Sequence, residues 1–213
     1  LVKQLSGYLE FQEKLMANFG QHVAKKNIST FIGLNHFPRK YLAGEKTGKV
    51  TKTTEKNSEI LLDDLDKSLL KELAADGKAS LLELAGKTGL SPNAVKYRMR
   101  RMEKERIIIG YRTMIDSKPL GYTYYKADLF LNDTHIIKQL REQIALHPNT
   151  TFEDICVGGS DFEFDGEFKD DESFLDMIAS IYNQHPGKIR NHTFYKAKRI
   201  HAYKYYPGPR NQI

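Results

Sequence analysis

Apolar side chains recur every three or four residues from position 62 onward, which is the spacing of a helix with one buried face. The residues that carry this spacing are Leu62, Leu65, Leu69 and Leu73. They predict a helix over about 63–76, and Asp63 and Asp66 supply side-chain acceptors where it begins. Gly77 ends this helix.

Two further helices follow after short breaks. Ser80 and Glu83 form a capping-box pattern that predicts a helix over about 81–88. Gly89 ends this short helix, and a serine followed by proline at residues 91–92 begins a third helix over about 92–105. Three closely spaced helices with a short middle member are typical of a helix-turn-helix domain.

The segment after the third helix predicts a wing. Residues 107–115 are rich in β-branched side chains and contain one glycine, as a short strand hairpin would. Residues 116–121 are expected to form a hinge.

The rest of the chain alternates between strand and helix patterns. The expected order is strand (122–131), helix (134–147), strand (150–157), strand (162–168), helix (171–183) and strand (188–204). Two βαβ halves of this kind predict a ferredoxin-like βαββαβ sandwich. The expected fold class is therefore α+β, with a winged helix-turn-helix domain at 60–116 and a ferredoxin-like ligand-binding and dimerisation domain at 117–208.

A partial repeat precedes these two domains. Residues 11–42 align without gaps on residues 174–205, so that Leu15 and Phe19 fall on Ile178 and Tyr182. We infer that residues 1–44 are the last helix and strand of a first ferredoxin-like domain whose beginning is missing. An unrelated N-terminal addition is the alternative. Residues 45–59 are polar and are expected to form a linker.

Composition narrows the class of protein. With 213 residues, 40% of them hydrophobic, the chain is expected to fold as more than one domain. The formal charge of +6 favours a polyanionic partner, although a basic charge alone is a weak signal. The single cysteine, Cys156, lies in a strand-like run and is expected to be buried and inert. It allows no internal disulfide or zinc cluster, which fits a reducing cytoplasm.

Other kinds of site find no support in the sequence. No histidines lie at a metal-ligand spacing with a carboxylate on one helix face, so no metal is expected. No phosphate loop, nucleophile elbow or dinucleotide motif is present, and no cofactor or enzyme activity is expected. No apolar run approaches the roughly 20 residues of a membrane span, and the cytoplasm is the expected location.

The third helix has two distinct sides. Val95, Met99 and Met102 share one side and are expected to face the core. The opposite side is basic and rich in hydrogen-bonding groups, as a helix that enters the major groove would be. The expected DNA-binding residues are Ser91, Asn93, Lys96, Tyr97, Arg100, Arg101, Lys104, Arg106 and Arg112. The alternative is an ordinary solvated basic helix.

Position along the helix separates two kinds of contact. Asn93, Lys96 and Tyr97 lie toward the N-terminus and are expected to contact bases, whereas Arg100, Arg101, Arg106 and Arg112 are expected to contact phosphates. Lys96→Ala should therefore lose sequence discrimination. Arg101→Ala should lower affinity uniformly and flatten the salt dependence.

These motifs resemble the Lrp/AsnC, or feast/famine, family of transcriptional regulators. The resemblance covers residues 60–205, and a tandem-domain archaeal-type or a bacterial member fits it best. The residues that carry it are Leu62-Asp63-Asp64-Leu65-Asp66, Leu84-Ala85, Gly89-Leu90-Ser91-Pro92, Arg98, Arg100-Arg101-Met102-Glu103, Ile107-Ile108, Gly110-Tyr111-Arg112 and Leu120-Gly121. One departure is Arg106, which stands where the family usually has glycine. A left-handed residue would be strained there, so the helix is expected to end differently.

The resemblance implies an effector site in the sandwich. The turn Gly158, Gly159, Ser160 and Asp161 is similar to the turn where the family binds effector amino acids near subunit boundaries. Backbone amides beside the glycines can bind a ligand carboxylate, and Asp161 can pair with an ammonium group. A plain hairpin turn is the alternative.

The sequence thus predicts a DNA-binding regulator with duplex DNA as its partner, a possible amino-acid-like effector, and a homodimeric or larger assembly. Two alternatives stay open. One is a ligand-binding partner protein that has no DNA target, and the other is a tetrapyrrole-modifying enzyme, similar to a sirohaem decarboxylase, on the same fold.

Overall fold

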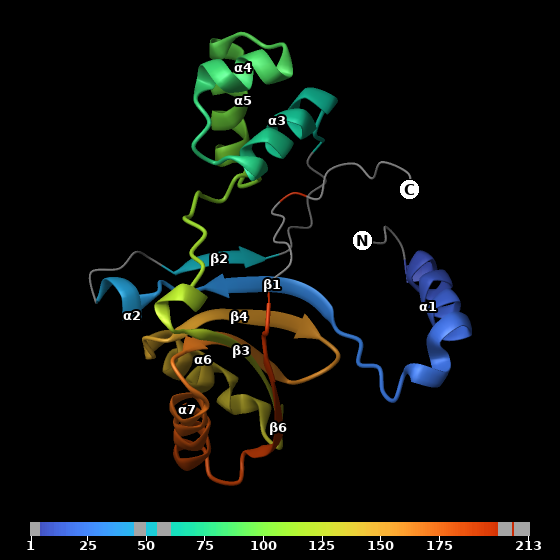
Figure 1. Ribbon diagram of the computed structural model, residues 1–213, viewed down its shortest axis with the longest axis vertical. Helices are drawn as coiled ribbons and strands as arrows, with labels where there is room; N and C mark the ends of the chain where they lie inside the picture. The colour runs from blue at the N-terminus through green and yellow to red at the C-terminus, as the bar shows by residue number, and fades with distance from the viewer. Residues whose placement is uncertain (1–4, 45–49, 55–60, 200–205, 207–213) are drawn as a thin grey trace.

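The computed structural model describes residues 5–44, 50–54, 61–199 and 206. Figure 1 shows a three-helix part that an extended segment connects to a mixed sheet-and-helix part. In the described ranges, no helix is long and apolar enough to cross a membrane.

The three-helix part follows the predicted boundaries closely. It consists of α3 (Asp64–Ala75), α4 (Leu81–Thr88) and α5 (Pro92–Lys104). Asp63 and Asp66 form a capping box at the start of α3, and Ser80 and Glu83 form another at the start of α4. Gly89 ends α4 in the left-handed conformation, with φ of 71°.

One small core holds these helices together. Its fully buried members come from all three helices and include Leu69, Leu84, Val95 and Met102. Burying a side chain of this size contributes about 1.5–3 kcal/mol, so the four together outweigh any single surface contact.

The predicted wing hairpin is wrong. No residue of the described stretch 105–117 belongs to a strand, and this stretch is the extended segment of Figure 1. Ile107 and Ile108 pack against the three-helix core. Their β-branched side chains therefore serve helix packing rather than strand pairing, a distinction that residue type alone does not make.

The second part has the predicted βαββαβ order. Its elements are β3 (Thr123–Leu131), η3 (Thr134–Ile136), α6 (Ile137–Leu146), β4 (Thr150–Val157), β5 (Phe162–Phe168), α7 (Asp171–Gln184) and β6 (Ile189–Lys196), preceded by the short helix η2 (Lys118–Leu120). The four strands pair antiparallel in the order β4-β5-β3-β6. This is the arrangement of a ferredoxin-like sandwich.

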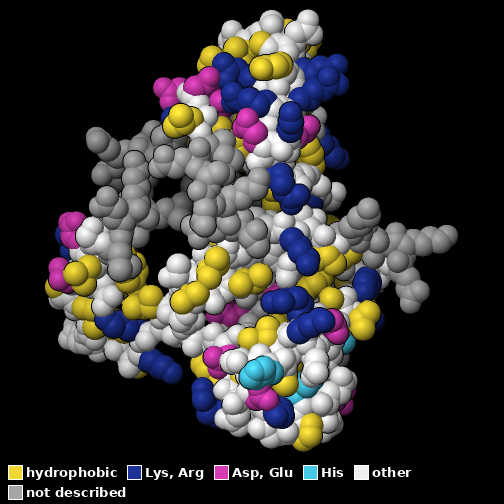
Figure 2. All heavy atoms as spheres, turned by 180° about the vertical axis from the view of Figure 1, so that it is seen from behind, with side chains coloured by type: hydrophobic (Ala, Val, Ile, Leu, Met, Phe, Trp, Pro, Cys, Tyr) yellow, Lys and Arg dark blue, Asp and Glu magenta, His cyan; other side chains and the backbone are white. Residues whose placement is uncertain are grey.

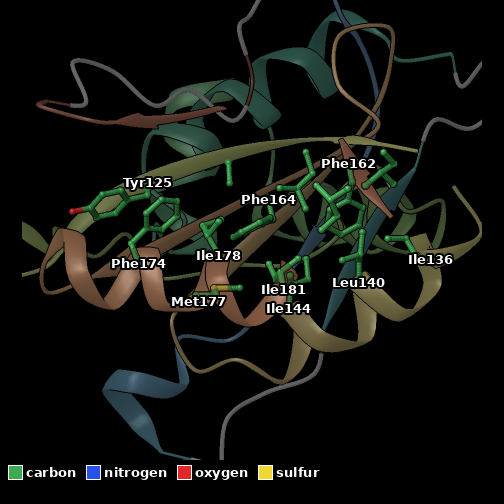
Figure 3. Close-up of a cluster of buried hydrophobic side chains, with 14 of the residues drawn as sticks. Tyr125, Ile136, Leu140, Ile144, Phe162, Phe164, Phe174, Met177, Ile178 and Ile181 are labelled. Atoms are coloured by element: carbon green, nitrogen blue, oxygen red, sulfur yellow. The ribbon is translucent and has the colours of Figure 1, made fainter. Parts of the chain in front are cut away.

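Helices α6 and α7 cover one face of the sheet. Figure 3 shows the core between them, where Tyr125 and Phe174 stack with their ring centroids 4.6 Å apart. Phe164, Ile144 and Ile181 belong to the same cluster and are fully buried. The opposite face of the sheet carries no helix of the sandwich, and we call it the open face.

The last strand is shorter than predicted. β6 ends at Lys196, opposite Tyr125, although the pattern favoured a strand as far as residue 204. The partner strand begins at Thr123, so little backbone is left to pair with beyond that point. Residues 197–199 are not in a strand, and residues 200–204 lie outside the described part of the chain.

The N-terminal segment forms α1 (Leu5–Phe19), η1 (Gly20–His22), β1 (Thr30–His36) and α2 (Lys40–Ala43). Strand β1 pairs antiparallel with β4, and Asn35 donates a 2.6 Å hydrogen bond to the buried Glu153. Helix α1 stands apart from the sheet (Figure 1), and Phe11 and Phe19 are more than half exposed.

The expected linker is partly a strand. Within residues 45–59, β2 (Thr51–Thr54) pairs with β1, which extends the sheet to the order β2-β1-β4-β5-β3-β6. Alternating threonines can form such an edge strand without burying an apolar face. The other linker residues, 45–49 and 55–59, lie outside the described part.

Candidate functional site

The face of α5 that points away from the core carries the predicted base-reading residues. Val95 and Met102 are fully buried and Met99 is partly buried, which confirms the predicted core side. Residues on the other side are exposed, and the phenol ring of Tyr97 is the clearest case at 71%. The exposed members of the predicted set on this helix are Asn93, Lys96, Tyr97, Arg100 and Lys104. Figure 2 shows Lys and Arg side chains gathered over the three-helix part.

Ser91 fixes where this face begins. Its hydroxyl accepts a 3.2 Å hydrogen bond from the backbone N–H of Ala94, and Pro92 takes the first helical position. Pro92 has no N–H and the N–H of Val95 bonds to the Ser91 carbonyl, so the N–H of Asn93 remains available in the first turn, and the helix dipole favours an anion there. A phosphate beside the N-terminus of α5 would meet both features.

Two arginines of α5 are bound within the domain. The guanidinium of Arg98 donates 2.7 Å hydrogen bonds to both Asp63 and Asp66. Arg101 pairs with the other oxygen of Asp66, whose side chain is only 1% exposed. The carboxylates raise the pKa of Arg98, and hydrogen bonds from the Asp66 amide and then from Arg98 lower the pKa of Asp63.

The arginines predicted to bind phosphate thus fall into two kinds, those that are exposed and those that are bound within the domain. Arg100 is exposed, whereas Arg101 is held beside the start of α3 by a buried carboxylate. Sequence reasoning overlooked the internal role of Arg98 and Arg101. Two features of the sequence could have indicated this role. Arg98 and Arg101 are three residues apart at the edge of the core side of α5, and two acids, Asp63 and Asp66, stand at the start of another helix.

Arg106 ends α5 in the conformation that the sequence argument considered strained. Its φ is +59°, so the expectation that the helix would avoid this conformation is wrong. The N–H of Ile107 bonds to the carbonyl of Met102, and the N–H of Arg106 bonds to that of Glu103. This pair of bonds is a Schellman motif, and burial of Ile107 against the core helps to hold it.

Arg112 lies at the sandwich rather than along α5. Its guanidinium carbon is 5.0 Å from the ring centroid of Phe152 on β4, a cation–π distance. The imidazole of His36 packs on the same ring, also at 5.0 Å. Burial, followed by the charges of Arg112 and Arg39, lowers the pKa of His36 to about 4, so this histidine is neutral near pH 7.

The predicted effector turn joins β4 to β5. Gly158 and Gly159 both have positive φ, 81° and 74°, which explains why glycine occupies both positions. The hydroxyl of Ser160 donates to Glu163 at 2.9 Å. One carboxylate oxygen of Asp161 accepts a 2.7 Å hydrogen bond from the N–H of Leu131. The four residues are thus together, and Asp161 already has one partner.

The N-terminal segment approaches this turn closely. A Cβ atom on Gly158 would lie 2.9 Å from the carbonyl oxygen of Ile28, and one on Gly159 would lie 3.1 Å from the Cβ of Ser29. Close packing against the N-terminal segment, by backbone at Gly158 and by the Ser29 side chain at Gly159, is therefore a second reason for glycine at both positions. Sequence reasoning considered only the turn and the ligand.

Cys156 is half-buried near the same turn. Burial and the nearby Glu163 and Asp154 carboxylates raise the pKa of its thiol. A raised pKa means less thiolate and lower reactivity. The side chain is half-buried, whereas the sequence predicted a buried one.

Comparison with known proteins identifies the three-helix part. Residues 62–103 match the family model of the AsnC-type helix-turn-helix domain. LrpA, a helix-turn-helix transcriptional regulator of Mycobacterium tuberculosis, is 48% identical over 61 residues, which are 29% of this chain and 41% of that protein. This alignment therefore spans less than half of the length of LrpA.

A longer alignment extends into the sandwich. The transcriptional regulator AzlB of Bacillus subtilis is 31% identical over 141 residues, which cover 60% of this chain and 83% of AzlB. Both relatives are regulators rather than enzymes.

Among solved structures, a transcriptional regulator from Neisseria meningitidis in complex with L-Met shares the fold. Its TM-score is 0.61 at 15% identity, over 68% of this chain and 96% of that one. At this identity the similarity shows the fold alone.

Proposed function

The chain belongs to the Lrp/AsnC family of helix-turn-helix transcriptional regulators, and from this premise we propose that it binds specific duplex DNA sequences through α5. The observation that carries the proposal is the division of α5 into a buried apolar side and an exposed basic side. Asn93, Lys96 and Tyr97 would contact base edges, and Arg100 and Lys104 would contact phosphates. Because the proposed partner is genomic DNA, the cytoplasm is the proposed location.

Binding-site selection from random duplexes, followed by anisotropy titrations at several salt concentrations, tests this proposal. We expect a selected sequence to bind with an affinity that falls steeply as salt rises. Lys96→Ala should bind selected and scrambled duplexes more equally than the wild type does, and exposed Lys138 of α6 provides the matched control, Lys138→Ala. The absence of salt-sensitive binding to any duplex would contradict the proposal and favour a ligand-binding partner protein.

The turn at residues 158–161 is the proposed effector site. The backbone amides of the two left-handed glycines would bind a carboxylate, and one oxygen of Asp161 remains to meet an ammonium group, which together suit an amino-acid-like ligand. The L-Met complex of the Neisseria regulator adds support at the level of the fold. Calorimetry against the common amino acids tests the assignment, and the absence of heat from all of them would leave a plain turn.

Pairing of two copies through the part of the open face around Lys126 is the proposed mode of assembly. Lys126 lies at the centre of this face, 2.7 Å from Asp154 and 2.8 Å from Glu163. Lys196 of β6 is not available to the acids of this face, because it pairs with Asp171 of the same chain at 2.6 Å. Light scattering combined with gel filtration gives the number of subunits, and a monomer at micromolar concentration would contradict the proposal.

Residues 1–44 are proposed to be the closing helix and strand of another ferredoxin-like unit, with 45–59 as the link to the unit at 60–208. In the partial repeat, Leu15 of α1 aligns with Ile178 of α7. Ile178 is 4% exposed, whereas Leu15 is 38% exposed. The apolar side of α1 thus has the composition of a sheet-covering helix without a sheet beneath it. Hydrogen exchange of the α1 amides in the protein expressed with its upstream coding region should show strong protection, and fast exchange there would count against a tandem arrangement.

A further inference from the structure

A cavity of about 560 Å³ lies between the N-terminal segment and the open face of the sheet. Small-molecule sites in proteins span roughly 300–1,000 Å³, so the size suits a compact ligand. The lining residues are Lys25, Asn27, Phe130, Arg190, Asn191, Thr193 and Tyr195. None of them belongs to the turn at 158–161.

The floor of the cavity is built by two neighbouring strands. Phe130 of β3 lies opposite Asn191 of β6, and Thr193 and Tyr195 follow at alternate positions along β6. Alternate residues of a strand share one face, and Tyr125, at odd spacing from Phe130, lies on the helix-covered face. The floor therefore belongs to the open face and presents two aromatic rings, Phe130 and Tyr195.

The N-terminal segment supplies the other wall. Asn27 lines the cavity, and its amide nitrogen is 3.7 Å from the place where a Cβ atom on Gly159 would lie. The chain around Asn27 is held against the turn by the close approach of Ile28 to Gly158. The wall is therefore anchored to the sandwich.

Two cations from different segments, Lys25 of the N-terminal segment and Arg190 of β6, give the cavity its charge. Lys25 and Arg190 are exposed, and neither makes an ion pair or hydrogen bond with another described residue. Nearby Lys188, in contrast, pairs with Asp133 at 2.8 Å. The carboxyl nearest in register is Asp128, opposite Thr193, and it is 6% exposed.

We propose that this cavity binds a small carboxylate that carries a flat ring. Lys25 and Arg190 bind the carboxylate from its two sides, Asn27 and Asn191 offer hydrogen bonds, and the ring lies against Phe130 and Tyr195. The site shares no lining residue with the proposed effector turn, although Asn27 lies beside Gly159, and its occupation requires no DNA.

Saturation-transfer NMR and calorimetry with benzoate test the proposal on the full chain without DNA. Benzamide has the same shape without the charge, and inorganic phosphate has charge without a ring. We expect benzoate to bind saturably. Benzamide should bind at least about tenfold more weakly, because it lacks the charged hydrogen bonds to Lys25 and Arg190. Phosphate should also bind at least about tenfold more weakly, because it has no ring to lie against Phe130 and Tyr195. Equal binding of phosphate would refute the role of the rings, and equal binding of benzamide would refute the role of the cations.

Variants locate the site. Lys25→Ala and Arg190→Ala should each weaken benzoate binding about tenfold or more, whereas Lys138→Ala should leave it unchanged. Asp161→Asn, which keeps an acceptor for the Leu131 amide, should also leave it unchanged, because Asp161 belongs to the turn. Undiminished binding by both Lys25→Ala and Arg190→Ala, or saturation that Asp161→Asn abolishes, would overturn the assignment to this cavity.

Discussion

At the scale of single residues, two arginines of the same helix have different roles. Arg100 and Arg101 are neighbours on α5, yet only Arg101 reaches the buried carboxylate of Asp66. An unpaired buried charge is costly, so this contact stabilises the junction of α3 and α5. Arg100 has no such contact among the described residues and can meet a phosphate without first breaking an ion pair.

Substitution of these neighbours should separate stability from binding. Arg100→Ala should reduce the slope of log affinity against log salt by about 1, with an unchanged unfolding midpoint. Arg101→Ala should lower the stability of the three-helix part by about 1–2 kcal/mol, a figure reduced for the partial exposure of Arg101. Anisotropy titrations and native-state hydrogen exchange measure the two effects. Equal loss of stability in both variants would contradict the division.

A substitution at Arg106 should raise the stability of the three-helix part, whereas Arg101→Ala should lower it. A non-glycine residue in the left-handed conformation costs about 1 kcal/mol, so Arg106→Gly should stabilise the three-helix part by up to that amount. Glu105→Gly is the control, because Glu105 has φ of −77° and glycine there should destabilise. Hydrogen exchange at the amides of α3, α4 and α5 gives both values. A destabilised Arg106→Gly would mean that side-chain contacts of Arg106 outweigh the backbone strain.

At the scale of elements, the open face of the sheet concentrates acids around one lysine. Asp128, Glu163 and Asp165 are each less than 10% exposed, and one oxygen each of Asp128 and Asp165 has no hydrogen-bond partner. Burial, followed by the charge of Asp154, raises the pKa of Asp165 to about 7. The sheet thus holds a carboxyl that changes charge near neutral pH.

The sign of the pH effect follows from that shift. The folded pKa of Asp165 lies above its ordinary value of 3.8, so its contribution to stability is full below about pH 4 and is lost as pH rises through 7. Asp165→Asn should match the wild type near pH 4 and exceed it by on the order of 4 kcal/mol at pH 8. Urea unfolding across this range measures the difference, and a gap independent of pH would show that Asp165 is ionised throughout.

At the scale of the whole molecule, one buried carboxylate connects three segments. Glu167 of β5 accepts hydrogen bonds from Arg39 at 2.6 and 3.1 Å, from the hydroxyl of Tyr41, and from Ser117 at 3.1 Å. Arg39 and Tyr41 belong to the N-terminal segment, and Ser117 ends the extended connector. Glu167 therefore joins the N-terminal segment and the connector to the sandwich.

Loss of this charge should loosen the placement of the DNA-binding part. In Glu167→Gln we expect a broader distribution of distances between labels on α4 and α7, because a neutral amide accepts a weaker hydrogen bond from Ser117, at the end of the connector, than a carboxylate does. Affinity for a single DNA half-site should not change, since α5 is untouched. Single-molecule energy transfer gives the distribution, with Glu142→Gln of exposed α6 as control. An unchanged distribution would show that the connector is held by other contacts.

Local patterns determined the three helices and the order of the sandwich. Capping boxes at Asp63 and Ser80, the left-handed Gly89 and the apolar spacing of α5 act over three or four residues, and such short-range rules can be read from a sequence. The strand boundaries of β4 and β5 were predicted correctly for the same reason, because turns and alternation define them locally.

The tertiary structure alone decided which partners these elements meet. It placed the β-branched segment at 107–115 in a connector, ended β6 where β3 begins, and bound Arg101 to Asp66 across 35 residues of sequence. It also brought Lys25 and Arg190 to the walls of one cavity. Charge, β propensity and side-chain type limit what a residue can do, but contacts between distant segments determine its partner, because burial and pairing energies depend on the surroundings that the whole fold creates.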